Sequence, residues 1–399
     1  ITNISGQPQE LKVDFTASGG VSAINKQQNI SLAHNEKTTL TYQVTGKDIK
    51  GQANFSLQIQ GKQLEKNIKR HWSLGLRPAY PARRSTYTKM LTQDESFTLP
   101  ASAISDLIPN SIQAKATITN HADIDLDEQL SQLLQYPYGC LEQTTSRAYP
   151  LLFADQEQQK NFSLKKMTKT ERIKMINQAL ERLATLQLSN GGYSLWSNTG
   201  REAYWLTAYV ADFLVNARDM GLTIPKQLFT RTLTRLQQYL ARNSHFYDEP
   251  RSDNAQHYYF AYQAYAAYVL AKVNQVPLST LRNLANHHSQ HAETGLSQLH
   301  LAIALDKMGD HKYSQILLKQ ALNNLPRQDR PYLADYGSQI RDLAMMIQLM
   351  LSHQFASDEA IKLSFTLATQ LKNKSYLSTQ ERNAVFLAGR LLISRPQTA

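Results

Sequence analysis

Hydrophobic and polar residues alternate along the first part of the chain and follow a helical period along the rest. Residues 11–15, 38–44 and 53–59 alternate with a period of two, which is typical of half-buried strands. From Asp125 onward, apolar residues recur three and four positions apart, as on the buried face of a helix. This pattern predicts helices at 127–135, 171–186, 204–217, 228–240, 255–270, 279–289, 295–308, 311–324, 335–352, 357–371 and 379–393.

The change of period predicts an α+β multidomain protein with three parts. Residues 1–75 are expected to form a small β-sandwich. Residues 76–124 form a short β joint, broken by prolines, with two further strands at 96–99 and 111–119. Residues 125–399 are expected to be all-helical. Their helices come in pairs without a strict repeat, which favours an α/α toroid or a short solenoid. In a toroid, the alanine- and tyrosine-rich helix 255–270 would suit an inner position.

Composition excludes several classes of protein. The formal charge is +11, but no basic run is interleaved with aromatic residues and no nucleic-acid motif is present, so we expect no nucleic-acid partner. A single cysteine excludes an internal disulfide framework. We expect no cofactor and no metal, since His287 and His291 are read as part of an exposed helix face. The chain begins at Ile1 without a methionine or a signal sequence, so we expect a fragment of a longer protein.

The only cysteine, Cys140, lies in the stretch Tyr136-Pro-Tyr-Gly-Cys-Leu-Glu-Gln143. In a helical turn, residues three apart share a face, so Cys140 and Gln143 are expected to meet. A thiolate that attacks a carboxamide carbon displaces ammonia and leaves an intrachain thioester. Gly139 is expected to allow a tight turn, the following helix N-terminus to favour the thiolate, and Tyr136 and Tyr138 to exclude water.

This stretch resembles the thioester motif of the α2-macroglobulin family in its bacterial form. Animal relatives usually carry glycine or a similarly small residue where this chain has Leu141. Residues 190–196 and 205–210 are also similar to the helical thioester domain of the family. The two tryptophans in these stretches, Trp196 and Trp205, are expected to be core residues. The resemblance implies that 76–124 begin an interrupted β-domain and that 1–75 form a macroglobulin-type β-sandwich.

The resemblance also implies a function, that of a broad-range protease inhibitor rather than an enzyme. A lysine amine of an attacking protease takes the acyl carbon of Gln143, and Cys140 leaves as a thiol. The full-length protein is expected to be a periplasmic lipoprotein on the inner membrane, monomeric, and partnered with a penicillin-binding protein.

Other interpretations remain open at the level of sequence. In some relatives a downstream histidine redirects the acyl group to hydroxyls, and the candidates here are His257 and His245. The same histidines are the candidate bases if Cys140 is instead the nucleophile of a cysteine hydrolase. A helical binding scaffold without a thioester is the third interpretation. Glu142 is read either as a residue that shapes the turn or as a solvated acid of the first helical turn.

Overall fold

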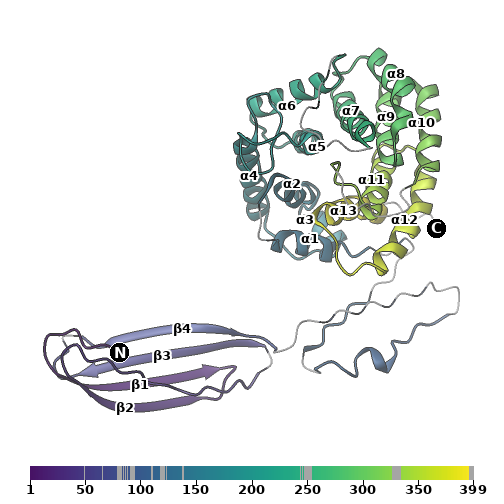
Figure 1. The fold of residues 1–399 in the computed structure, drawn as a ribbon. Coiled ribbons are helices and arrows are strands. Elements are labelled where there is room, and N and C mark those ends of the chain that lie inside the picture. The colour runs from purple at the N-terminus through teal and green to yellow at the C-terminus, as the bar shows by residue number, and fades with distance from the viewer. Residues whose placement is uncertain are drawn as a thin grey trace. The chain divides into compact units, whose positions relative to one another are not determined.

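The computed structural model of the chain contains two compact units, Ile1–Thr117 and Ile118–Ala399 (Figure 1). It describes residues 1–48, 50–64, 66–78, 83, 85, 87, 89, 95–108, 111–116, 122, 124–136, 139–242, 244, 246, 254–325 and 334–394. Among these residues, no helix is both long enough and apolar enough to cross a membrane.

The first unit contains one antiparallel sheet with the strand order β2–β1–β3–β4. The strands are β1 (Gln9–Gly19), β2 (Ile24–Leu32), β3 (Gly51–Gly61) and β4 (Ile68–Leu76). Buried and more exposed residues alternate along the central strand β1. Val13 and Phe15 therefore point to the apolar face of the sheet, and their neighbours along the strand point to the opposite face. That apolar face gives the unit two small hydrophobic clusters.

The strand predicted at 38–44 is absent. The alternation of apolar and polar residues there instead reflects which side chains pack on the sheet. Tyr42 and Val44 pack on the apolar face of the sheet, and the Tyr42 ring stacks on Phe15 with centroids 4.2 Å apart. The segment thus supplies the second layer of the expected sandwich without joining a hydrogen-bonded ladder. The strands predicted at 96–99 and 111–119 are likewise absent from the described residues 95–100 and 111–116, because no described strand offers them a partner.

The second unit is helical, and the predicted helices are confirmed to within a few residues. Helix α11 begins at Gln339 rather than at 335 because the Ser338 side chain caps its first turn. A capping box formed by Ser378 and Glu381 opens the last helix. The α-helices are α1 (Leu126–Gln135), α2 (Leu141–Ala148), α3 (Gln156–Asn161), α4 (Lys169–Leu186), α5 (Tyr204–Asp219), α6 (Lys226–Tyr239), α7 (Ala255–Lys272), α8 (Leu278–His287), α9 (Gly295–Lys307), α10 (His311–Asn323), α11 (Gln339–Ser352), α12 (Ser357–Lys372) and α13 (Thr379–Ile393).

These helices form a ring with an inner and an outer layer (Figure 1). The inner helices α2, α5, α7, α9, α11 and α13 contact one another in order, and α13 returns to α2 and closes the ring. Inner α7 and α9 are buried on almost every side, whereas outer α6 and α10 bury one stripe. This is the expected α/α toroid, and helix 255–270 takes the inner position that its composition predicts.

Candidate functional site

Cys140 is the N-cap residue of α2, the first inner helix. Its backbone is extended, with φ −68° and ψ 171°. Its N–H donates to Oε1 of Gln143 at 3.3 Å, and its side chain faces the backbone N–H of Gln143 in return. This is a capping box with cysteine in the place of the usual serine or threonine. The two residues of the predicted acyl pair therefore lie against each other, although Cys140 precedes the helix instead of lying within its first turn.

The Cys140 thiol is buried, with 6% of the residue exposed. Burial raises the pKa of this thiol, and the negative charge of Glu142 adds to the effect, while the N–H of Gln143 acts in the opposite direction. The net pKa is above the ordinary value. The N–H groups at the helix N-terminus thus favour the thiolate, as expected, but burial outweighs them.

A loop between α4 and α5 holds the turn that carries Cys140. The N–H of Leu141 donates to the carbonyl oxygen of Leu195 at 2.9 Å. The Arg182 guanidinium, on α4, donates to the carbonyl oxygens of Gly139 and Trp196, each at 3.4 Å. Sequence reasoning missed Arg182, because nothing in the local pattern marks a half-buried arginine that bridges two loops.

The same loop contains the glycines that are sterically required. Gly191 has φ +93°, and a Cβ there would lie 2.4 Å from a backbone oxygen of α6. A Cβ on Gly192 would lie 2.1 Å from Oε1 of Glu202, a nearly buried carboxylate. At Gly139, by contrast, the nearest described atom to such a Cβ is Thr144 Oγ1, 3.9 Å away. The tight turn expected at Gly139 stays a prediction, since Tyr138 before it lies outside the described residues.

Trp196 lies in the loop between α4 and α5 and is 65% exposed, so the prediction that it is a core residue is wrong. Its carbonyl oxygen accepts the hydrogen bond from Arg182, while its side chain is exposed to solvent. The isolated β-bridge between Ser194 and Glu202 lies next to it. Trp205, also predicted as core, is 2% exposed and stacks under the Arg341 guanidinium at 4.6 Å from its ring.

Glu142 is buried, which excludes its interpretation as a solvated acid. Its Oε1 accepts a hydrogen bond from Ser146 Oγ at 2.7 Å, and its Oε2 accepts one from Thr379 Oγ1 at 2.6 Å. Thr379 is the first residue of α13, so the carboxylate ties the helix after Cys140 to the last inner helix. Burial raises the pKa of Glu142, and these hydrogen bonds oppose the rise.

The two tyrosines of the motif differ in what the structure describes. Tyr136 is half-buried at the C-terminal end of α1. Tyr138 lies outside the described residues. The shielding role assigned to both stays a prediction.

His257 lies near the N-terminus of α7 and is 2% exposed. Its Nε2 is 3.1 Å from Oδ2 of buried Asp335, and its Nδ1 accepts the N–H of Glu293 at 3.1 Å. Both ring nitrogens are thus engaged, and neither has a free lone pair for acyl transfer or for general-base catalysis. His245 lies outside the described residues.

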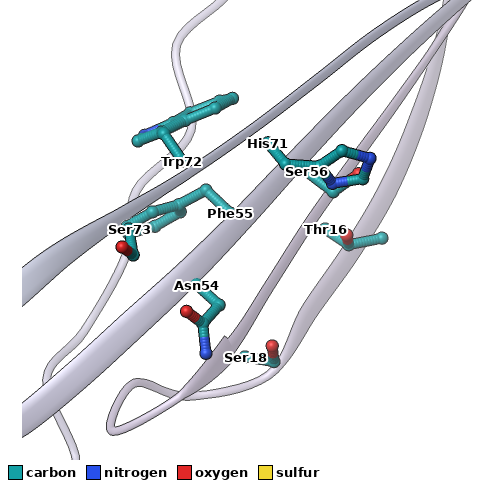
Figure 2. A pocket seen from close by; sticks show the side chains of 8 residues that line it. All are labelled: Thr16, Ser18, Asn54, Phe55, Ser56, His71, Trp72 and Ser73. Carbon is teal, nitrogen blue, oxygen red and sulfur yellow. The ribbon is translucent and has the colours of Figure 1, made fainter.

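One cavity lies on the sheet of the first unit, and its lining does not include Cys140. It is an open trough of about 450 Å³ on the sheet of the first unit, and Figure 2 shows its lining. The lining residues come from β1, β3 and β4 and are Thr16, Ser18, Asn54, Phe55, Ser56, His71, Trp72 and Ser73. In the part of the chain that the structure describes, no three His, Cys, Asp or Glu side chains are grouped to hold a metal.

Comparison with known proteins places the chain in a family. A family model described as the A-macroglobulin TED domain matches residues 101–323. Alpha-2-macroglobulin of Escherichia coli (strain K12) is 35% identical over 99% of this chain, and that of Xylella fastidiosa (strain Temecula1) is 30% identical over 98%. The chain spans about a quarter of the length of these relatives, 24% of each.

Solved structures agree with this placement. Native E. coli alpha-2-macroglobulin matches 98% of this chain and 25% of its own with a TM-score of 0.82 and 33% identity. Salmonella alpha-2-macroglobulin reacted with methylamine matches 100% of this chain and 26% of its own, with a TM-score of 0.81 and 33% identity. Its toroid, its capping pair of Cys140 and Gln143 and these matches together assign the chain to the α-macroglobulin family, whose TED domain it contains.

Proposed function

We propose that this chain carries the acyl-trapping site of a protease inhibitor, with an intrachain thioester between Cys140 and Gln143. The observation that carries the proposal is the reciprocal capping contact of these two residues at a buried N-terminus. Capping fixes the side chains before reaction, so little conformational entropy is lost in forming the bond. Burial of the sulfur keeps water from the acyl group.

The proposed reaction occurs in two steps. The Cys140 sulfur attacks Cδ of Gln143, the C–N bond breaks, and the nitrogen leaves as ammonia with the thiol proton. Later, a lysine amine of a bound protease attacks the same carbon, the C–S bond breaks, and the electron pair and a proton go to the sulfur. The product is an isopeptide between the protease and residue 143, so the site acts once and is not an enzyme.

The relatives support a protease as the partner. One solved structure is of trypsin-activated E. coli alpha-2-macroglobulin, and another is of the same protein activated by porcine elastase. The Salmonella structure reacted with methylamine supports a site open to amines. For the full-length protein we propose a broad-range covalent inhibitor that is monomeric, lipid-anchored at the inner membrane and periplasmic, with a penicillin-binding protein as its partner.

Intact mass spectrometry of the freshly purified chain tests the thioester. The expected mass is that of the sequence minus one ammonia, and methylamine is expected to add once while exposing one thiol. Heating is expected to split the chain between Glu142 and Gln143. A hydrolysed sample would still carry glutamate at position 143, which peptide mapping detects.

Two variants serve as controls. Cys140→Ser and Gln143→Asn are expected to keep the fold and the full sequence mass, and neither should take up methylamine. An unmodified glutamine at 143 together with a freely titrating Cys140 in the native chain would contradict the proposal and favour a helical scaffold without a thioester. Repeated turnover of an ester substrate would favour a cysteine hydrolase.

A further inference from the structure

Glu142 is a buried carboxylate two residues after the sulfur that the proposed reaction expels. It occupies the second helical position of α2 and is 6% exposed. Its side chain lies among the polar groups of α2, α5 and α13. These groups are Ser146, Tyr209, Thr379, Gln380 and Asn383.

The hydrogen bonds around Glu142 have one consistent direction. The amide nitrogen of Asn383 donates to the hydroxyl oxygen of Tyr209, which leaves the tyrosine proton free to donate to Ser146 Oγ at 3.0 Å. Ser146 also accepts from the amide nitrogen of Gln380 at 3.3 Å, so its own proton goes to Glu142.

Glu142 is therefore the final acceptor of this chain of hydrogen bonds, and Thr379 Oγ1 donates to its second oxygen. A carboxyl group that only accepts on both oxygens is ionised.

No cation compensates this charge among the described residues. The groups that face Glu142 from its own helix, from α5 and from α13 are hydroxyls and an amide, and no described ion pair includes it. Hydroxyl donors stabilise a buried anion less than an ion pair does, so the negative potential of Glu142 reaches its surroundings with little screening. Cys140, two residues before Glu142, is the residue that gains negative charge in the proposed reaction.

We propose that Glu142 is a positioning residue that prolongs the life of the thioester by making the Cys140 thiolate a poor leaving group. The inference rests on the proposed function. When an amine attacks Cδ of Gln143, the C–S bond breaks and negative charge develops on sulfur. The Gln143 N–H stabilises that charge, and the Glu142 carboxylate destabilises it. A thioester with a less stable thiolate reacts more slowly with amines and with water, because a leaving thiol of lower pKa leaves faster.

The isosteric variant Glu142→Gln tests the inference in the whole chain, with Glu171→Gln as its matched control. Glu171 is the third residue of α4, it accepts a hydrogen bond from the N–H of Thr168 at the start of that helix, and it is exposed. With Glu142→Gln, methylamine is expected to release the thiol at least about threefold faster. After opening, the pKa of the Cys140 thiol, read from the pH dependence of its alkylation rate, is expected to fall by about one unit. Glu171→Gln is expected to change neither.

The thiol measurement keeps the test decisive if Glu142→Gln fails to form a thioester, because the free thiol titrates with or without prior acylation. An unchanged thiol pKa in Glu142→Gln overturns the inference. A native chain that never forms a thioester would overturn the proposed function instead, which mass spectrometry shows separately. Thr379→Val is a second variant. It removes one donor that compensates the carboxylate while keeping the side-chain shape, so the thiol pKa is expected to rise, opposite in direction to Glu142→Gln.

Discussion

The N–H of Leu141 and the carbonyl oxygen of Leu195 are joined by a hydrogen bond of 2.9 Å across 54 residues of chain. The bond links the residue after Cys140 to the loop between α4 and α5. That loop is held in turn by Gly191 and Gly192, which approach α6 and Glu202 too closely for any side chain. The geometry of the proposed thioester therefore depends on residues about 50 positions away.

Alanine at Gly192 tests this dependence. A Cβ 2.1 Å from Glu202 forces the carboxylate or the loop to move, so Gly192→Ala is expected to lower the free energy of unfolding by about 1–3 kcal/mol. It is also expected to speed thioester loss. Gly75→Ala, in β4 of the first unit, where a Cβ would have nothing within 4 Å, is the control and should leave both unchanged. Chemical denaturation measures the change in stability, and timed thiol release measures the loss of the thioester. Equal behaviour of the two variants would contradict the dependence of the thioester on the loop between α4 and α5.

Asp212 and Lys272 form a buried ion pair of 2.9 Å between α5 and α7. Burial raises the pKa of Asp212, but the charge of Lys272 and the hydrogen bond from the Tyr149 hydroxyl lower it by more. The net pKa lies below the ordinary value. Removing one partner leaves a buried charge, so Lys272→Met is expected to cost about 3–5 kcal/mol of unfolding free energy. The double variant Asp212→Asn with Lys272→Met should cost less than Lys272→Met alone. A double variant that is less stable than either single one would show that the pair is not coupled.

His300 makes the stability of the helical unit sensitive to acid. Burial lowers its pKa to about 3, and its ring stacks on Tyr265 with centroids 4.3 Å apart. Between pH 6.5 and 3 the unfolded chain binds the proton that folded His300 does not. Stability is therefore fully present above pH 6.5 and is lost as pH falls, by about 1.4 kcal/mol per pH unit. His353, with its pKa lowered to about 4 by burial, adds a second loss of the same sign over pH 6.5 to 4.

Urea unfolding at pH 7 and pH 5 measures this effect. His300→Phe keeps the stacking and removes the titration, so its stability is expected to fall less between the two pH values. Exposed His311 provides the control, and His311→Gln should follow the native chain. Identical pH slopes in the native chain and His300→Phe would refute the assignment.

His257 is expected to act in structure and not in acyl transfer. Burial raises the pKa of its partner Asp335, but the hydrogen bond from His257 and the charge of Arg341 dominate and lower that pKa to about 2. His257→Gln should lose about 1–3 kcal/mol of stability. On the proposed thioester, the ratio of methylamine to glycerol products should stay unchanged. A shift of that ratio away from glycerol esters would restore the acyl-transfer role.

The sequence by itself determined the features that depend on neighbouring residues. Helical periodicity located the inner and outer helices, because side chains three and four apart share a face wherever the helix lies. The spacing of Cys140 and Gln143 placed them together for the same reason. Each of these relationships is contained within a few turns of chain.

Tertiary structure decided what distant segments do to these elements. Glu142 looks like an ordinary acid of a first helical turn, and only contact with Thr379, 237 residues later, makes it a buried anion. Trp196 is a large aromatic residue of the kind that usually lies in a core, yet in the folded chain it is exposed to solvent. Residues 38–44 have the alternation of a strand but lack a ladder partner. Burial and strand pairing depend on which surfaces meet in the folded chain, and the local order of residues does not contain that information.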